Sequence, residues 1–322
     1  MPSVHSTLYT AYTLLTQPAR LVTWWLYYIP KSNRPNPAWS WKRAATLQVV
    51  ILLIRYRTAI RYRTPKALEP GPDGDRFIVL HPNLKTESAV YKGKLTPVPA
   101  VQPHQLARAG TQQPQPSPHE SSSSISTQAP MYSSALDPAM DVAGDPRNSI
   151  PPSQIVLSGE SAGGNLILAM LRYITTENQA IPLPRCALLW SPWVDMTIKA
   201  LLEMDQHRNY KSDYIEYDFG SWGASSYIPP GWSDSNPYLS PLGSEYRLSV
   251  PLFIEVGTSE VLYDNIVLFA HNMREKGTEV ELREATNGVH ATFGIADTLG
   301  MSEVAIDGHA RGARFNARTG GD

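Results

Sequence analysis

A glycine-rich turn between a short apolar run and an apolar helix is the feature that most constrains the fold. Gln154 to Ser158 predicts a buried strand, and the chain then runs Gly159-Glu-Ser-Ala-Gly-Gly164 before the apolar helix Asn165 to Thr176. A serine flanked in this way is typical of a sharp strand-to-helix turn, where a side chain at either glycine would collide with neighbouring backbone. The start of the helix directs free N–H groups and a positive dipole end toward that serine. The sequence therefore predicts that Ser161 projects from the end of a strand.

Further strand and helix patterns follow this turn. Two short apolar runs, Cys186 to Trp190 and Leu252 to Val256, predict strands, and so does the alternating segment Thr278 to Ala285. Apolar residues at helical spacing predict a helix over Asp264 to Lys276, which a glycine ends. Alternating strands and helices favour an α/β fold with a mostly parallel sheet flanked by helices. Functional side chains of such sheets gather at the carboxyl ends of the strands.

Late histidines are candidate bases for Ser161. A serine hydroxyl becomes a good nucleophile when a histidine removes its proton and a carboxylate orients that histidine, and after such a turn the chain order is serine, acid, histidine. His290 follows the last predicted strand, within Asn287 to Phe293, and is the favoured base. His309 lies in a polar tail with no strand before it.

Two carboxylates are candidates for the acid. Glu260 follows the strand Leu252 to Val256 at the expected distance, and it is the favoured acid. Asp264 lies one helical turn later on the same face and is the alternative. Asp195 also follows a strand, but it comes too early for the usual order, so we expect it to have a structural role.

Charge and cysteine content exclude several classes of protein. The 28 basic and 29 acidic residues give a formal charge of -1, so no strongly basic surface for nucleic acid is expected. The single cysteine, Cys186, rules out an intrachain disulfide and a cysteine-based zinc site. The sequence also has no histidine pair at helical spacing and no phosphate-binding glycine loop, so it implies no metal and no organic cofactor. Without an N-x-[ST] acceptor, a cytoplasmic or peripheral endomembrane location is favoured over secretion.

Residues 1–68 form a basic and aromatic arm. The arm holds ten Lys or Arg residues and no Asp or Glu, and it is rich in Trp and Tyr. Its apolar runs, Leu21 to Ile29 and Ala44 to Ile54, are shorter than the ~20 residues that a bilayer span needs. Two interpretations stay open and are compatible: a peripheral membrane anchor, or amphipathic helices that pack on the main domain and cover a ligand pocket.

The rest of the chain divides by composition. Residues 69–100 contain an early strand, and residues 101–150 turn to Gln, Pro, Ser and Ala, which predicts disorder. We expect residues 151–310 to form the ordered core, with a cap insertion at about 196–238, and residues 311–322 to be a flexible tail.

Five landmarks together resemble the hormone-sensitive-lipase-like group of α/β hydrolases, particularly its fungal members. They are Gly159 to Gly164, Ser191 to Asp195, Asn236 to Pro241, Gly257 to Asp264 and Val289 to Phe293. The resemblance implies an α/β-hydrolase fold with a helical cap. It also implies hydrolysis of a small-molecule apolar ester, which is either an ester with a small to medium acyl chain or a secondary-metabolite ester. It further implies that Ser161 is the nucleophile, His290 the base, and Glu260 the acid where the group usually carries Asp.

One departure from that group concerns the oxyanion hole. The group carries an H-G-G-G loop whose N–H groups supply most of the hole, and no such segment occurs in this chain. The nearest counterpart is Phe77 to Asn83, where Pro82 has no N–H to donate. The N–H of Ala162 is then the expected oxyanion donor. Two explanations stay open, an incompletely assembled gene sequence or a chain that has lost catalysis, so the alternative function is a non-catalytic protein that binds an apolar ligand or a membrane surface.

Overall fold

Four parallel strands form the central sheet of the described residues, which in this computed structural model are 4–60, 77–80, 106–109, 151–229 and 231–320. The strands of this sheet are β3 (Val156–Glu160), β4 (Cys186–Trp190), β5 (Leu252–Gly257) and β6 (Val280–Ala285), in that order across the sheet. A second, antiparallel pair consists of β1 (Phe77–Leu80) and β2 (Leu106–Ala109). The helices are α1 (Val4–Tyr27), α2 (Trp41–Ala59), α4 (Ala162–Thr176), α5 (Ile198–Glu203), α6 (Tyr217–Tyr227), α7 (Tyr263–Glu275), α8 (Thr292–Leu299) and α9 (Ser302–Thr319). Short 3₁₀ turns lie at Lys31–Asn33, Pro152–Gln154, Met204–Gln206 and Tyr210–Ser212.

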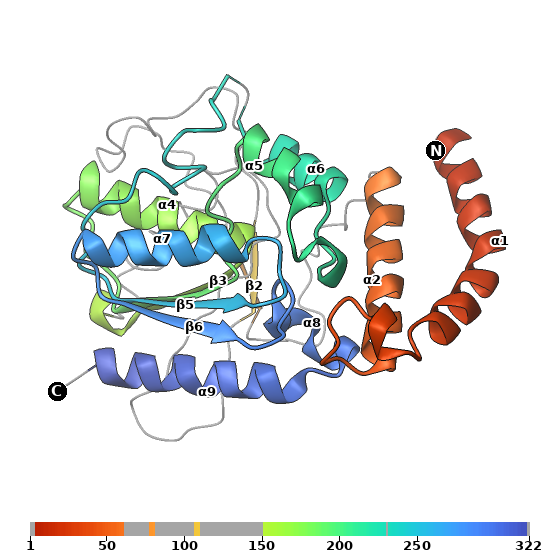
Figure 1. Cartoon of the computed structure of the whole chain (residues 1–322). Helices are drawn as coiled ribbons and strands as arrows, with labels where there is room; N and C mark the ends of the chain where they lie inside the picture. Colours follow the sequence, from red (N-terminus) through yellow and green to blue (C-terminus); the bar gives the residue numbers. More distant parts are fainter. Residues whose placement is uncertain (1–3, 61–76, 81–105, 110–150, 230, 321–322) are drawn as a thin grey trace.

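The strand order explains where the helices lie. Neighbouring strands of the sheet follow each other in the chain, and right-handed crossovers between such strands place their helices on one face. Figure 1 shows α4 and α7 on one face and α9 on the other. Glu160 pairs with Trp190, and Trp190 with Glu255, so the carboxyl ends of the strands meet along one edge. That edge carries the segments that the sequence singles out.

Side chains alternate between the two faces of the sheet. Leu157, Leu189 and Ile254 belong to the main core, which also holds Phe269 of α7. The opposite face presents Val156, Cys186, Trp190 and Phe253, and α9 covers it with Phe315. Strands β4 and β5 are buried on both faces and are short apolar runs in the sequence, whereas the edge strand β6 is only half buried and alternates.

The C-terminal segment is more ordered than its sequence suggests. Residues 311–322 are predicted to be a flexible tail, but helix α9 continues to Thr319. Phe315 is 1% exposed, and its ring centroid lies 5.8 Å from that of Phe253. The positions of α9 that face the sheet include Gly308 and Gly312, which let the helix approach closely. The prediction failed because small residues give this helix a weak apolar pattern.

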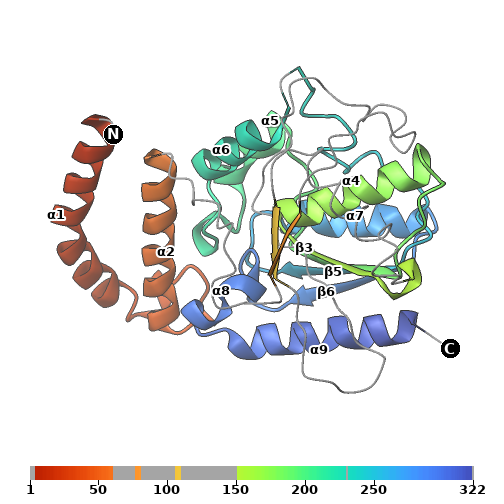
Figure 2. The same cartoon turned by 180° about the vertical axis from the view of Figure 1, so that it is seen from behind.

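The basic arm forms a helical hairpin. Helix α2 begins at the N-cap Ser40, whose Oγ accepts a hydrogen bond from the N–H of Arg43. It packs against α6 and α8, and α1 lies on its outer side (Figures 1 and 2). In the part of the chain that the structure describes, no helix combines the length and hydropathy of a bilayer span. The arm therefore contributes one helix layer next to α6 and a second, outer layer.

The connection between α1 and α2 is tied to the main domain. The side-chain amide of Asn36 donates to Asn287 Oδ1 at 2.8 Å and to Ser259 Oγ at 3.1 Å. The indole N–H of Trp39 donates to the carbonyl of Asn287 at 3.1 Å. Arg34 holds the turn itself by donating to carbonyls on both sides of it. This connection therefore lies against the loop that leads to His290.

The early strand and the low-complexity segment are described only in part. Phe77 pairs with Ala109, and Leu80 with Leu106. Residues 106–109 therefore form a strand paired with residues 77–80, although they belong to the segment 101–150 that is predicted to be disordered. The rest of that segment, and His81 to Asn83, lie outside the described residues. The expected cap region, 196–238, contains α5 and α6.

Candidate active site

Ser161 lies at the sharp turn between β3 and α4. Its backbone has φ 53° and ψ -117°, which a non-glycine residue rarely adopts, and it immediately precedes the first residue of α4. A Cβ on Gly159 would lie 2.6 Å from the carbonyl oxygen of Gly163, so the turn excludes a side chain there. The N–H of Ser161 donates to the Trp190 carbonyl at 2.9 Å. The predicted strained turn is present, and it presents the serine at the carboxyl edge of the sheet.

His290 is brought to Ser161 by the loop after β6. Its Nε2 lies 2.9 Å from Ser161 Oγ, within hydrogen-bond distance, across 129 residues of sequence. The side chain is 3% exposed, and burial lowers the pKa of His290 to about 3, since a buried imidazolium loses its hydration. A neutral imidazole with Nε2 facing a hydroxyl is the arrangement that accepts a proton from it.

Glu260 lies behind His290. Its Oε1 is 4.0 Å from His290 Nδ1, and neither atom has another hydrogen-bond partner. Its other oxygen, Oε2, accepts hydrogen bonds from Ser191 Oγ at 2.6 Å and from the N–H of Gly257 at 3.2 Å. Complete burial raises the pKa of Glu260, and the Asp213 carboxylate raises it further. The distance of 4.0 Å between these two unpartnered atoms is a close contact but longer than a hydrogen bond.

Ser191 and Asp213 support this cluster, and sequence reasoning missed both. Ser191, at the end of β4, donates to Glu260 and accepts from the N–H of Ala291 at 3.0 Å. Asp213 comes from the cap region and is fully buried. Its Oδ1 accepts from the N–H of His290 at 3.2 Å, and its Oδ2 accepts from the N–H of Val261 at 2.8 Å. One carboxylate thus binds the backbone of both loops, and no local motif around Asp213 signals this contact.

Replacing Asp213 with Asn is expected to lower the free energy of unfolding by about 1–3 kcal/mol, because one buried N–H group then loses its acceptor. Asp213 Oδ1 also accepts from the N–H of Tyr214, so both oxygens are in use. Urea denaturation of the variant and of the original chain would measure the difference. Asp218→Asn, an exposed carboxylate in α6, is the matched control. Equal midpoints for all three proteins would show that Asp213 does not hold the two loops.

The other candidate residues lie elsewhere. Asp264 is half exposed and binds His207 and Arg208 rather than His290, because the helix α7 turns it outward. His309 packs against Phe293, with ring centroids 4.1 Å apart. Asp195 Oδ1 accepts from the N–H of Thr197, a local turn contact that fits the structural role expected for it. Ala162, the expected oxyanion donor, is the first residue of α4, where N–H groups lack an intrahelical acceptor.

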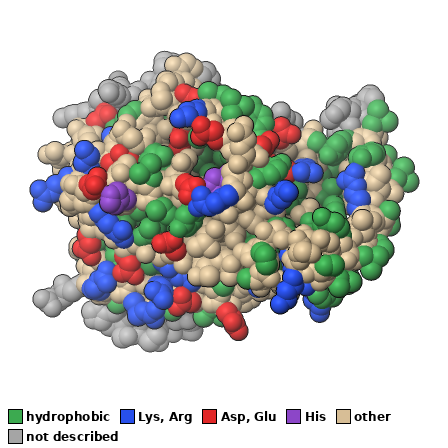
Figure 3. All heavy atoms as spheres, in the orientation of Figure 1, with side chains coloured by type: hydrophobic (Ala, Val, Ile, Leu, Met, Phe, Trp, Pro, Cys, Tyr) green, Lys and Arg blue, Asp and Glu red, His purple; other side chains and the backbone are tan. Residues whose placement is uncertain are grey.

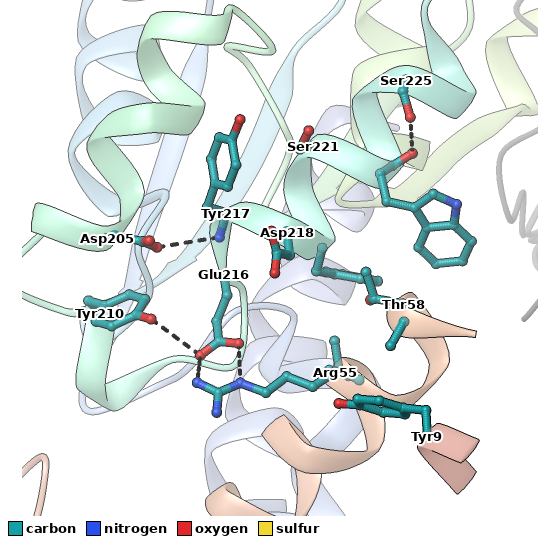
Figure 4. A pocket seen from close by; sticks show the side chains of 14 residues that line it. Tyr9, Arg55, Thr58, Asp205, Tyr210, Glu216, Tyr217, Asp218, Ser221 and Ser225 are labelled. Carbon is teal, nitrogen blue, oxygen red and sulfur yellow. Dashed lines mark hydrogen bonds and ion pairs between the residues drawn. The ribbon is translucent and has the colours of Figure 1, made fainter. Parts of the chain in front are cut away.

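A separate cleft of about 560 Å³ lies between α2 and α6. Its lining includes Tyr9, Tyr210, Tyr217 and Trp222, and Arg55 crosses it to bind Glu216 through two hydrogen bonds (Figure 4). Neither Ser161 nor His290 lines this cleft. Within the described ranges, no group of three or more His, Cys, Asp or Glu side chains is arranged to hold a metal ion.

Comparison with known protein families shows which fold family the chain belongs to. A family model described as the alpha/beta hydrolase fold matches residues 119–294, which is more than half of the chain and includes β3 to β6. The chain belongs to the α/β-hydrolase fold family. The α/β fold class predicted from the sequence, with a mostly parallel sheet flanked by helices, is thereby confirmed.

Curated relatives within this fold carry hydrolase names. An acetyl-hydrolase of Streptomyces hygroscopicus is 28% identical over 172 residues, which cover 53% of this chain and 54% of that protein. An esterase of Acinetobacter venetianus is 28% identical over 135 residues, 42% of each chain. The chain thus aligns with about half the length of these relatives.

Among solved structures, a protein called EstE5 superposes with a TM-score of 0.48 at 23% identity, covering 59% of this chain and 60% of that one. A mutant of the esterase E40 gives 0.47 at 27% identity, covering 57% of this chain and 61% of the other.

Proposed function

We propose that this protein is a carboxylic ester hydrolase in which Ser161, His290 and Glu260 form the catalytic triad. The observation that carries the proposal is the 2.9 Å contact between Ser161 Oγ and His290 Nε2 at the carboxyl edge of the sheet. The named relatives, an acetyl-hydrolase and an esterase, support the same reaction class. The triad acid is a glutamate where the hormone-sensitive-lipase-like group usually has an aspartate.

The proposed reaction proceeds in two steps. In the first, Ser161 Oγ attacks the ester carbonyl while His290 Nε2 takes its proton, and His290 then returns the proton to the departing alkoxide. In the second, water attacks the acyl-serine while His290 Nε2 takes its proton, and His290 then returns this proton to Ser161 Oγ as the carboxylic acid is released. The N–H of Ala162 donates to the oxyanion in both steps. Glu260 orients His290 and stabilises the imidazolium that forms transiently.

An uncharged ester of small to medium acyl chain, or a secondary-metabolite ester, is the proposed substrate class. Tyr214 of the cap region packs against His290, with ring centroids 5.9 Å apart, and it is buried. Burial also raises the pKa of Tyr214, so this side chain stays neutral. A buried aromatic ring beside the base favours an uncharged substrate, because a charged group would lose its hydration there.

Labelling with a fluorophosphonate probe tests the proposal. We expect purified protein to gain the mass of one phosphonate on intact-mass analysis, because the activated Ser161 attacks phosphorus as it would a carbonyl. Ser161→Ala should abolish the labelling, and Ser153→Ala, at an exposed serine before β3, should leave it unchanged. Labelling that persists in Ser161→Ala would assign the nucleophile elsewhere.

A second candidate function is favoured by the missing H-G-G-G segment. With Ala162 as the one expected donor, the oxyanion is held more weakly, and each lost donor typically costs ~10²–10³ in kcat. The alternative is therefore a hydrolase-fold protein that binds an apolar ester without turning it over. It predicts a folded protein that binds an apolar ester analogue but takes up no phosphonate, which is the opposite result in the same labelling experiment.

A further inference from the structure

The outer face of α1 is apolar along its length except for Arg20, whose guanidinium donates to the Tyr12 hydroxyl at 2.8 Å. Leu8, Tyr12, Leu15, Val22 and Leu26 follow one another at helical spacing and are each more than 50% exposed, with Leu15 at 82%. Leu14, Leu21 and Trp25 form a second exposed row beside them, and the remaining exposed positions within α1 from Thr7 onward are Thr, Ala, Pro and Tyr. The helix has 24 residues, or about 36 Å, so this surface is long as well as apolar.

The inner face of α1 already has its partner. Tyr9 stacks on Tyr56 of α2 with ring centroids 6.2 Å apart, and Thr10 Oγ1 lies 2.9 Å from the Tyr56 hydroxyl. Packing against the domain therefore accounts for one side of the helix only. Soluble proteins rarely leave a contiguous apolar surface of this extent facing water, and such surfaces mark interaction sites.

Basic and aromatic side chains gather at the C-terminal end of this face. Trp25 contacts Trp41 edge-on, with centroids 5.1 Å apart, and the Nζ of Lys42 lies 5.8 Å from the Trp41 ring. Lys31, two residues beyond the exposed Ile29, is also exposed. Residues 1–68 contain no Asp or Glu, and no acidic side chain is seen over α1 at the right of Figure 3.

We propose that α1 docks this protein on an anionic phospholipid membrane, lying flat in the interface with its outer face toward the acyl chains. Lysines attract anionic headgroups, and Trp and Tyr rings favour the headgroup level. An apolar face with a single charged side chain, Arg20, suits interfacial binding, and α1 lacks the hydropathy of a bilayer span. A second copy of the chain fits less well, because it would bring two basic arms together without an acidic counterpart. The proposal is independent of catalysis.

Co-sedimentation of the full chain with vesicles tests the docking. We expect binding to phosphatidylcholine vesicles containing phosphatidylserine to exceed binding to phosphatidylcholine alone at least tenfold, and to weaken as salt is raised. The double variant Leu15→Glu, Val22→Glu should reduce binding to the anionic vesicles at least tenfold. Ile306→Glu, at an exposed apolar position of α9, is the matched control and should bind like the original chain.

Two further measurements keep the result unambiguous. Thermal unfolding of the variants, followed by circular dichroism, should match the original chain, because both substituted side chains already face water. Sedimentation equilibrium without lipid should give a monomer. Equal vesicle binding by the double variant would overturn the proposal, and so would a dimer that the double variant dissociates and that binds no vesicles.

Discussion

Glu260→Gln is expected to lower kcat/KM for an activated ester on the order of 10⁴-fold, provided that the proposed triad operates. Glu260 faces His290 Nδ1 through an oxygen that has no other partner. A glutamine at this position offers an N–H group to His290 in one of its two orientations, which favours the wrong tautomer of the imidazole. It also removes the charge that stabilises the imidazolium in the transition state.

Steady-state hydrolysis of a p-nitrophenyl ester would measure this loss. Glu303→Gln changes an exposed glutamate of α9 and should leave the rate unchanged. Asp264→Asn separates the two candidate acids, because its side chain binds Arg208 and His207 outside the cluster. If Asp264→Asn caused the larger loss, the acid would have to be reassigned.

Gly257→Ala is expected to lower the free energy of unfolding by about 3 kcal/mol, the upper part of the range for overpacking a core. The added Cβ would lie 2.5 Å from the carbonyl oxygen of Gly288 and 2.6 Å from that of Val289. These are backbone atoms, so no side-chain rotation relieves the contact. Gly257 ends β5, and Gly288 lies in the loop before His290, so relief must separate Glu260 from His290.

Urea denaturation and ester hydrolysis together would test this prediction, with both stability and activity reduced. Gly223→Ala is the control in α6, where the added Cβ meets Trp193 at 3.4 Å, an ordinary contact. That change should be neutral or stabilise the protein by up to about 1 kcal/mol, since alanine restricts the unfolded chain. Equal midpoints for Gly257→Ala and the original chain would mean that the loops adjust independently.

The sheet and the strained serine could be predicted because local patterns encode them. Strands β4 and β5 are buried and appear in the sequence as short apolar runs, β6 appears as an alternating segment, and the glycines around Ser161 are required by one tight turn. His290 and Glu260 could be proposed because chain order and strand ends restrict where a base and an acid can lie. In the structure these two side chains lie close together, whereas Asp264 lies apart from them and binds Arg208.

The contribution of the cap region could not be predicted, because its contacts are long-range. Asp213 is separated by 77 residues from the backbone N–H of His290 that it binds, and nothing in its neighbourhood distinguishes it from an exposed aspartate. Helix α9 was missed for a related reason. Its buried positions recur at helical spacing, but they are largely Ala and Gly, which pack well against Trp190 and Glu255 and stand out little as apolar residues in the sequence.

The connection between α1 and α2 joins two regions that the sequence keeps far apart. Asn36 and Trp39 hydrogen-bond to Asn287, three residues before His290. Binding of α1 to a surface, if it shifted this connection, would therefore change the stability of the loop that holds His290. Thermodynamic linkage makes such an influence reciprocal: a ligand that changes the order of the loop changes the affinity of α1 for its surface by the same factor. If α1 docks on a membrane as proposed, membrane binding and ligand binding would be linked through Asn36 and Trp39.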